Sequence, residues 1–187
     1  MSTALLLIDL QNDYFPGGAM ELEGADAAVA RCARLLEAFR SRGLPPIHVQ
    51  HASTRTGATF FVPGTGGVEI HPAVAPRDGE AVFTKHFPNA FRDTPLLAHL
   101  RAQSITRLVI AGMMTQMCID TSTRAASDMG FECTLAHDGC ATRAQSFGGR
   151  TVASADVQAA FMASLNGLFA KVITTDEAIA LIQLRLP

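Results

Sequence analysis

The chain has 187 residues, of which 48% are hydrophobic and 17% are charged, and its formal net charge is −2. This composition predicts one globular domain over residues 1–187, large enough to bury a core, and excludes a disordered chain. The low net charge, and the lack of any apolar run near the roughly 20 residues of a membrane span, exclude nucleic acid and membranes as expected partners.

Apolar runs and turn residues divide the chain into alternating strands and helices. Short continuous apolar runs predict buried strands, at residues 4–9, 46–51, 80–85, 108–111, 131–136 and 171–173. Apolar residues spaced three and four positions apart predict helices, at 25–42, 95–103, 118–129, 152–165 and 176–184. Residues 52–79 are rich in Gly and Pro, and the pair Phe60 and Phe61 favours a packed lid there. A polar loop is predicted at 137–149.

Strands that alternate with helices indicate an α/β fold, with a mainly parallel six-stranded sheet and helices on both faces. In such sheets ligands bind outside the carboxyl ends of the strands. Three reactive residues occupy that position: Asp9 after the first strand, Lys85 after the third and Cys118 after the fourth. Taken singly, each has an ordinary explanation as a turn residue, a solvated amine or a small buried thiol. Together they indicate a site at one edge of the sheet.

Residues 107–130 are predicted to form a buried strand, a turn containing Gly112, and a helix that carries Cys118 in its first turn. Thr115 is the candidate N-cap of this helix. A helix N-terminus favours a thiolate, and its free backbone N–H groups can hold an oxyanion. On position alone, this location is equally compatible with a reactive cysteine and with a small buried thiol.

A thiol, a carboxylate and an ammonium are sufficient for acyl transfer. Asp9 can take the Cys118 proton as a base and later return it to a leaving amine. The Lys85 ammonium would stabilise both the carboxylate and the thiolate. Water would then hydrolyse the thioester. Gln11 and Asn12, which follow Asp9 closely, either orient it or form the turn.

The chain resembles the isochorismatase-like cysteine hydrolases, a family that includes nicotinamidases and related amidases. The resemblance rests on four segments that together span nearly the whole chain: LIDLQNDY at 7–14, FTKHFPNAF at 83–91, AGMMTQMCID at 111–120 and AHDGCA at 136–141. It implies a Rossmann-like three-layer α/β/α sandwich and a catalytic triad of Asp9, Lys85 and Cys118. It also implies a cis peptide between Met113 and Met114, which would direct the Met114 N–H, with that of Cys118, into an oxyanion hole.

One part of the family pattern is missing. Nicotinamidases carry a metal site after the second strand, built from an acid and closely spaced histidines. Here Gln50 stands at the place of the acid, and His48, His51 and His71 do not match the pattern. We therefore expect no metal, no cofactor and no nicotinamidase activity. His51 is interpreted as a hydrogen-bonding residue of the lid or behind the triad.

Five residues are expected to contact the substrate: Tyr14, Phe60, Phe61, Phe91 and Gln116. Tyr14 matches a family position that carries an aromatic ring over the triad. Phe60 and Phe61 are equally compatible with a place in the core. Gln116 stands where many relatives have histidine, which would alter the contacts to the leaving group.

Cys118 favours an amide or related carbonyl substrate, because relatives that cleave the vinyl ether of isochorismate commonly lack the cysteine. The expected function is hydrolysis of a small amide, carbamoyl or related C–N bond through a thioester. The alternatives are a vinyl-ether hydrolase of the isochorismatase type and a catalytically idle binding or scaffold relative. A phospho-acceptor domain is disfavoured because no second acid follows Asp9, and a dinucleotide-binding domain because no GxGxxG follows the first strand.

The four cysteines show no CxxC spacing, and Cys32 and Cys133 are predicted to be core thiols. No basic region precedes the apolar run at 4–8, as a secretion signal would require. A reducing cytoplasm is therefore the expected compartment. By resemblance alone, a homodimer or homotetramer is expected.

Overall fold

The computed structural model describes residues 2–184, and its centre is a six-stranded sheet in which all neighbouring strands are parallel. The strands follow the order β3-β2-β1-β4-β5-β8. Leu6 of β1 pairs with Ile47 on one side and with Ile110 on the other. The strands are Ser2–Ile8 (β1), Pro46–His51 (β2), Ala81–Lys85 (β3), Ile105–Met113 (β4), Glu132–Ala141 (β5) and Lys171–Ile173 (β8). The predicted α/β fold is confirmed.

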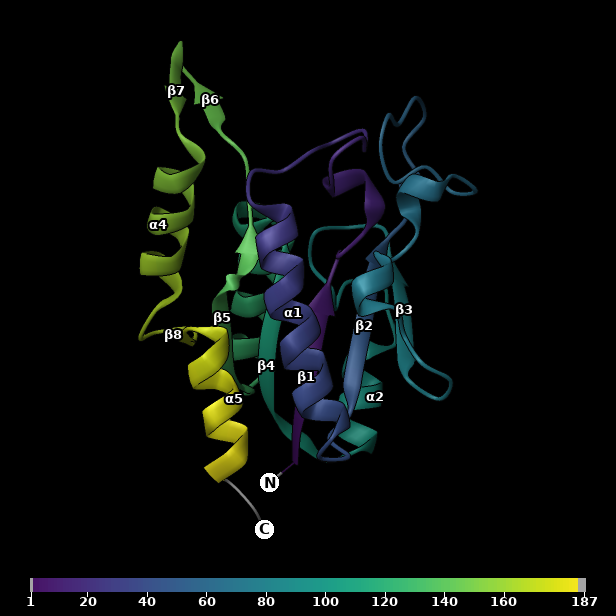
Figure 1. Cartoon of the computed structure of the whole chain (residues 1–187), viewed down its shortest axis with the longest axis vertical. Coiled ribbons are helices and arrows are strands. Elements are labelled where there is room, and N and C mark those ends of the chain that lie inside the picture. The colour runs from purple at the N-terminus through teal and green to yellow at the C-terminus, as the bar shows by residue number, and fades with distance from the viewer. Residues whose placement is uncertain (1, 185–187) are drawn as a thin grey trace.

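Helices cover both faces of the sheet, which gives the three layers of an α/β/α sandwich (Figure 1). Helices α1 and α5 pack with Leu5 and Leu7 on one face, whereas α2, α3 and α4 pack with Leu6 and Ile8 on the other. Successive strand residues point to opposite faces, so a strand covered on both sides needs a continuous apolar run. The helices are Ala25–Arg40 (α1), Leu96–Ala102 (α2), Asp120–Asp128 (α3), Ser154–Leu165 (α4) and Thr175–Leu184 (α5).

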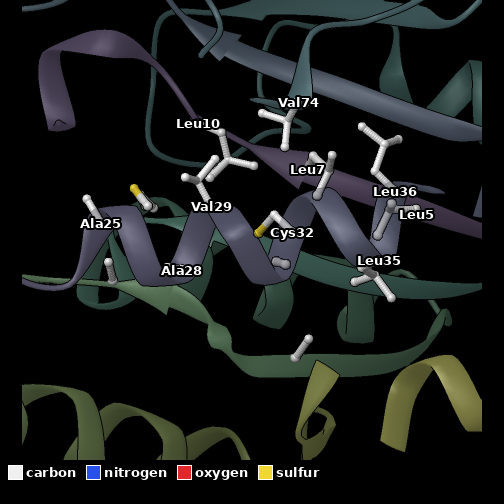
Figure 2. Close-up of a cluster of buried hydrophobic side chains, with 14 of the residues drawn as sticks. Leu5, Leu7, Leu10, Ala25, Ala28, Val29, Cys32, Leu35, Leu36 and Val74 are labelled. Carbon is white, nitrogen blue, oxygen red and sulfur yellow. The ribbon is translucent and has the colours of Figure 1, made fainter. Parts of the chain in front are cut away.

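The inner face of α1 forms one wall of the core (Figure 2). Its apolar residues recur at helical spacing, and Figure 2 shows several of them gathered between α1 and the Leu5 and Leu7 side chains of β1. All seven are buried: Ala25, Ala28, Val29, Cys32, Leu35, Leu36 and Phe39. This packing holds β1 in place, and Asp9 is the residue directly after β1.

The prediction of a polar loop at 137–149 is wrong in two places. Strand β5 continues to Ala141, and two short strands, Gln145–Phe147 (β6) and Arg150–Val152 (β7), form an antiparallel hairpin. Gly148 and Gly149 join them with φ values of 58° and 76°, which fits a two-residue hairpin turn of the primed type. Figure 1 shows this hairpin projecting beyond the sheet and leading into α4.

Residues 52–79 pack against the body of the protein as a lid, in agreement with the prediction. The lid contains two short 3-10 turns, Gly66–Val68 and Pro72–Val74. Backbone hydrogen bonds tie it to the segment after β1, from Asn12 N–H to Glu69 O at 3.0 Å and from His71 N–H to Leu10 O at 2.8 Å.

Among residues 2–184, no helix is long and apolar enough to cross a membrane.

Candidate active site

Three strands bring Asp9, Lys85 and Cys118 together at one edge of the sheet. Asp9 follows β1, Lys85 is the last residue of β3, and Cys118 lies in the turn after β4. Because β2 separates β1 from β3, the long Lys85 side chain is needed to reach Asp9. Asp9 and Lys85 are fully buried, and Cys118 is 5% exposed.

The Lys85 ammonium has four acceptors within hydrogen-bond distance. Its Nζ lies 2.7 Å from Asp9 Oδ2 and 3.2 Å from Cys118 Sγ. It also lies 3.0 Å from His51 Nδ1 and 3.1 Å from the Phe87 carbonyl oxygen. A lysine carries three N–H donors, so one acceptor is always left without a full hydrogen bond. Neither carboxylate oxygen of Asp9 has a well-aligned hydrogen bond among the described residues, so the carboxylate can receive a proton.

The surroundings of Cys118 raise the pKa of its thiol. Burial, and then the Asp9 carboxylate, raise the pKa of Cys118, and the opposing effect of Lys85 does not reverse this. Burial opposes the charge on Lys85, but the charges of Asp9 and Cys118 outweigh burial and raise the pKa of Lys85. Lys85 lowers the pKa of Cys118 and so favours the thiolate, as expected, but burial and Asp9 oppose it more strongly. A base must take the thiol proton, and Asp9 is in place to do so.

The turn that carries Cys118 is wider than an α-helical turn. It is a π turn, Thr115–Ile119, in which Ile119 N–H donates to Met114 O at 3.2 Å, and it precedes α3. The predicted helix therefore carries Cys118 in its first turn, and that turn is π-helical. The Thr115 side chain caps nothing in this turn: its hydroxyl contacts the Ala141 carbonyl and the Gln158 side chain.

Two backbone features lie just before this turn. Gly112 has φ +134°, and a Cβ there would collide with the carbonyl oxygen of Ile8, so only glycine allows β4 to pass so close to β1. The peptide between Met113 and Met114 is cis. The Met114 N–H makes no hydrogen bond to any residue in the described range 2–184.

A cavity of about 190 Å³ opens beside Cys118. Aromatic rings of Tyr14, Phe60 and Phe61 form one wall, with ring centroids 4.7 Å apart for Tyr14 and Phe61 and 5.0 Å apart for Phe60 and Phe61. Phe61 also belongs to the buried core. It therefore occupies both of the positions that the sequence allowed for it, the pocket and the core. The volume is below the roughly 300 Å³ of pockets for drug-sized ligands, which favours a small substrate.

The cavity lining also contains polar groups and a positive charge. These residues are His51, Ser53, Thr54, Arg55 and His86, and none of the described residues that line the cavity is acidic. Arg55 is exposed. An anionic or hydrogen-bond-accepting group therefore suits the cavity.

Phe91 and Gln116, both expected in the pocket, lie elsewhere. Phe91 is 8% exposed, belongs to the core and stacks on Phe131 with ring centroids 6.2 Å apart. The Gln116 amide oxygen accepts a hydrogen bond from the Thr142 hydroxyl. Neither side chain lines the cavity.

His51 contacts one of the three reactive residues, because its Nδ1 lies 3.0 Å from Lys85 Nζ. Burial and then the Lys85 charge lower the pKa of His51 to about 4. Gln11 holds the His51 backbone from both sides, donating to His51 O at 2.9 Å and accepting from His51 N–H at 2.7 Å. Its amide also donates to Val68 O in the lid at 2.6 Å. Gln11 therefore orients His51, whereas the sequence suggested only Asp9 or the turn.

A buried carboxylate, Asp13, fastens the lid over the aromatic wall. Its Oδ2 accepts from Phe61 N–H at 2.5 Å, and its Oδ1 accepts from Ala19 N–H at 3.2 Å. Phe61 has φ +52°, a left-handed conformation that is unfavourable for a bulky residue. The Asp13 contact thus holds Phe61 in a backbone conformation that it would not adopt by itself.

The centre does not suit a metal ion. Donor atoms of Asp9, His51 and Cys118 lie within 4.8 Å of one another, a spacing that could suggest a metal site. The Lys85 Nζ, however, lies within hydrogen-bond distance of each of the three. A buried ammonium already neutralises this donor set, and a second cation there would be repelled.

The chain is similar to known proteins over most of its length. The Isochorismatase domain family matches residues 3–177. The uncharacterized isochorismatase family protein YddQ of Bacillus subtilis is 46% identical over 176 residues, covering 94% of this chain and 98% of that protein. A maleamate amidohydrolase of Pseudomonas putida is 34% identical over 145 residues, covering 68% of this chain and 67% of that protein. A crystal structure from Oleispira antarctica, assigned to the isochorismatase hydrolases, has a TM-score of 0.92 at 52% identity and covers 96% of each chain.

Proposed function

Because this chain belongs to the isochorismatase family of hydrolases, we propose that it hydrolyses a small amide or N-carbamoyl compound through a thioester on Cys118. The observation that carries the proposal is the buried Lys85 ammonium within hydrogen-bond distance of both Asp9 and Cys118. A carboxylate base, a thiol and a fixed cation at one cavity are the parts that acyl transfer requires.

The proposed reaction begins with a proton transfer. Asp9 takes the thiol proton of Cys118 as the sulfur attacks the carbonyl carbon of the substrate, and Lys85 turns an N–H toward the new thiolate. The carbonyl oxygen becomes an oxyanion. The unpaired N–H of Met114, together with that of Cys118, is proposed to hold it, which is a contribution of about 3–4 kcal/mol per donor in related acyl transfers.

The second half of the proposed reaction regenerates the enzyme. Protonated Asp9 gives its proton to the departing amine, so the C–N bond breaks and the acyl group stays on sulfur. Water then attacks the thioester carbonyl and gives a proton to Asp9. When the new tetrahedral intermediate collapses, the C–S bond breaks, and the Asp9 proton returns to the Cys118 sulfur.

The substrate is proposed to carry an anionic group beside the amide. Two observations support this choice. Arg55 lines the cavity, and no acidic residue among those described lines it. In addition, the relative from Pseudomonas putida is named for maleamate, an amide that bears a carboxylate. A small anionic amide would place its carbonyl at Cys118 and its charge near Arg55.

A panel of small amides scored for ammonia release tests the proposal. The panel contains maleamate, maleamate methyl ester, N-carbamoylglycine, acetamide and nicotinamide, with Cys118→Ala as the blank and Cys133→Ala as the matched control. Turnover of an anionic member by the wild type and by Cys133→Ala, but not by Cys118→Ala, is the expected result. Equal turnover by Cys118→Ala would overturn it.

A further inference from the structure

The two ring nitrogens of His51 have different surroundings. Nδ1 lies 3.0 Å from Lys85 Nζ. Nε2 has no hydrogen-bond partner among residues 2–184, and this atom is not fully buried. His51 lines the cavity beside Cys118, and Nε2 is the ring nitrogen that Lys85 leaves available to a ligand there.

Lys85 determines which nitrogen of His51 carries the hydrogen. An ammonium can only donate hydrogen bonds, so Nδ1 must accept, and the neutral ring then carries its hydrogen on Nε2. A doubly protonated ring would put two donors face to face at 3.0 Å. The groups that face the ring agree with a neutral state: Lys85, His86 and Arg55 oppose a positive charge, and Asp9 alone favours it.

The ring is also held in place. The Gln11 amide fixes the His51 backbone through two hydrogen bonds. The Phe61 ring lies beside the imidazole, with ring centroids 5.7 Å apart and planes inclined by 30°. A neutral histidine with a fixed tautomer and a fixed ring is a directed hydrogen-bond donor, and such a group can polarise a carbonyl without adding a charge to the site.

We propose that His51 is a substrate-binding residue of this centre, and that its Nε2–H donates to an oxygen of the substrate. The inference rests on the proposed function, because that function puts the substrate carbonyl at Cys118. One ring nitrogen of His51 lies within 4.8 Å of both Cys118 Sγ and an Asp9 carboxylate oxygen, so the imidazole lies beside the atoms that are proposed to react. The ligand chemistry is an amide, ureido or carboxylate oxygen on or next to the group that reacts.

Nitrogen NMR tests the tautomer without any substrate. Uniformly ¹⁵N-labelled wild type is compared with His51→Asn, which removes one of six histidine signals and so assigns it. We expect a protonated Nε2 and an unprotonated Nδ1 for His51 from pH 5.5 to pH 8. A hydrogen on Nδ1, or an imidazolium at pH 7, would overturn the proposal.

The same signal tests whether Nε2–H reaches the reacting group. Iodoacetamide alkylation of Cys118 leaves a carboxamide in the cavity, which stands in for a bound amide. We expect the Nε2–H resonance to move downfield on alkylation and to exchange more slowly with water. An Nε2–H signal that does not change on complete alkylation would overturn the proposal, whatever the outcome for the hydrolytic function.

A third experiment measures KM and kcat of His51→Asn, with the amide of the panel that the wild type hydrolyses fastest as the substrate. Asparagine keeps an acceptor near the Nδ1 position for Lys85 but lacks a donor that reaches as far as Nε2. We expect KM of His51→Asn to rise about tenfold with kcat within about threefold, as for the loss of one binding contact. His99→Asn, on α2, is the matched control. Unchanged KM in His51→Asn would contradict the proposal, whereas turnover by Cys118→Ala would instead overturn the hydrolytic function.

Discussion

Asp9 and Lys85 form an ion pair of 2.7 Å in which neither side chain has any exposed surface. Removing two charges from water is costly, so such a pair is weak support for stability and is better explained by its chemistry. Asp9 also has a left-handed backbone, with φ 53°, which aspartate tolerates better than most residues. Stability and activity should therefore respond differently when the pair is replaced.

Replacing Lys85 with methionine should destabilise the fold and abolish turnover. The change leaves the Asp9 carboxylate buried without its cation, a situation that costs about 3–5 kcal/mol in the free energy of unfolding. The double variant Asp9→Asn/Lys85→Met removes both charges, so it should recover part of that loss without recovering activity. Urea unfolding and ammonia release measure the two effects. A double variant less stable than Lys85→Met would contradict this account of the pair.

The stability of the wild type should fall as the pH drops from 6.5 toward 4. The folded-state pKa of His51 is lowered from 6.5 to about 4, so in this window the unfolded chain binds a proton that the folded chain does not. His48, also lowered, contributes in the same direction. Glu80 acts below this range, because its pKa is lowered to about 2 and its contribution is lost as the pH falls below 4.5.

The variant His51→Asn isolates the His51 contribution to that slope. Free energies of unfolding by urea at pH 4.5, 5.5, 6.5 and 7.5 should decline less steeply for His51→Asn than for the wild type. The His48 contribution remains in both proteins and cancels in the comparison. Parallel pH profiles for the two proteins would show that His51 is not held neutral by folding.

Replacing Asp13 with asparagine should loosen the lid. One of the two carboxylate oxygens becomes an amide donor, so either the Phe61 or the Ala19 N–H loses its acceptor. A lost buried acceptor typically costs about 1–3 kcal/mol. We expect faster proteolysis within residues 52–79 and a KM raised about tenfold with a smaller change in kcat. Asp93→Asn is the matched control, because the same substitution there changes an exposed carboxylate; equal effects of the two variants would refute the role of Asp13.

Replacing Arg55 with glutamine should weaken the binding of anionic amides and leave neutral ones unaffected. Loss of one exposed charge contact corresponds to about a three- to tenfold rise in KM, which high salt should diminish. The measurement compares maleamate with its methyl ester, and Arg42→Gln serves as the control for a lost surface charge. An equal rise in KM for both compounds would mean that Arg55 supports the lid and does not bind the carboxylate of the substrate.

The sequence was sufficient for the sheet and for the three reactive residues because both follow from local patterns. Buried parallel strands need continuous apolar runs, and their carboxyl ends must meet at one edge. Asp9, Lys85 and Cys118 each end or follow such a run. The cis peptide at Met113 could be expected only from the family resemblance, since nothing in the residues themselves favours it.

Other features depend on contacts that no local pattern contains. Phe91 resembles a pocket residue in sequence, but the packing of Phe131 against it decides that it lies in the core. His51 acquires its role only when Lys85 reaches across the end of β2 to its Nδ1. The hairpin at Gly148 and Gly149, in contrast, could have been predicted from a local pattern. Gly-Gly between two alternating segments is a recognised turn signal, which the polar composition of the segment obscured.

The central claim is that Asp9 and Lys85 make Cys118 reactive, and Cys133 provides an internal comparison for it. Both cysteines are 5% exposed, both line a cavity, and burial raises the pKa of both. They differ in that only Cys118 contacts the ion pair. The most direct measurement is the rate of iodoacetamide alkylation at each cysteine, mapped by peptide mass spectrometry in the wild type and in Asp9→Asn/Lys85→Met, which lacks the ion pair. We predict that Cys118 is alkylated at least about tenfold faster than Cys133 in the wild type, and that Asp9→Asn/Lys85→Met removes most of this difference; equal rates in the wild type, or a preference that survives in the double variant, would contradict the account.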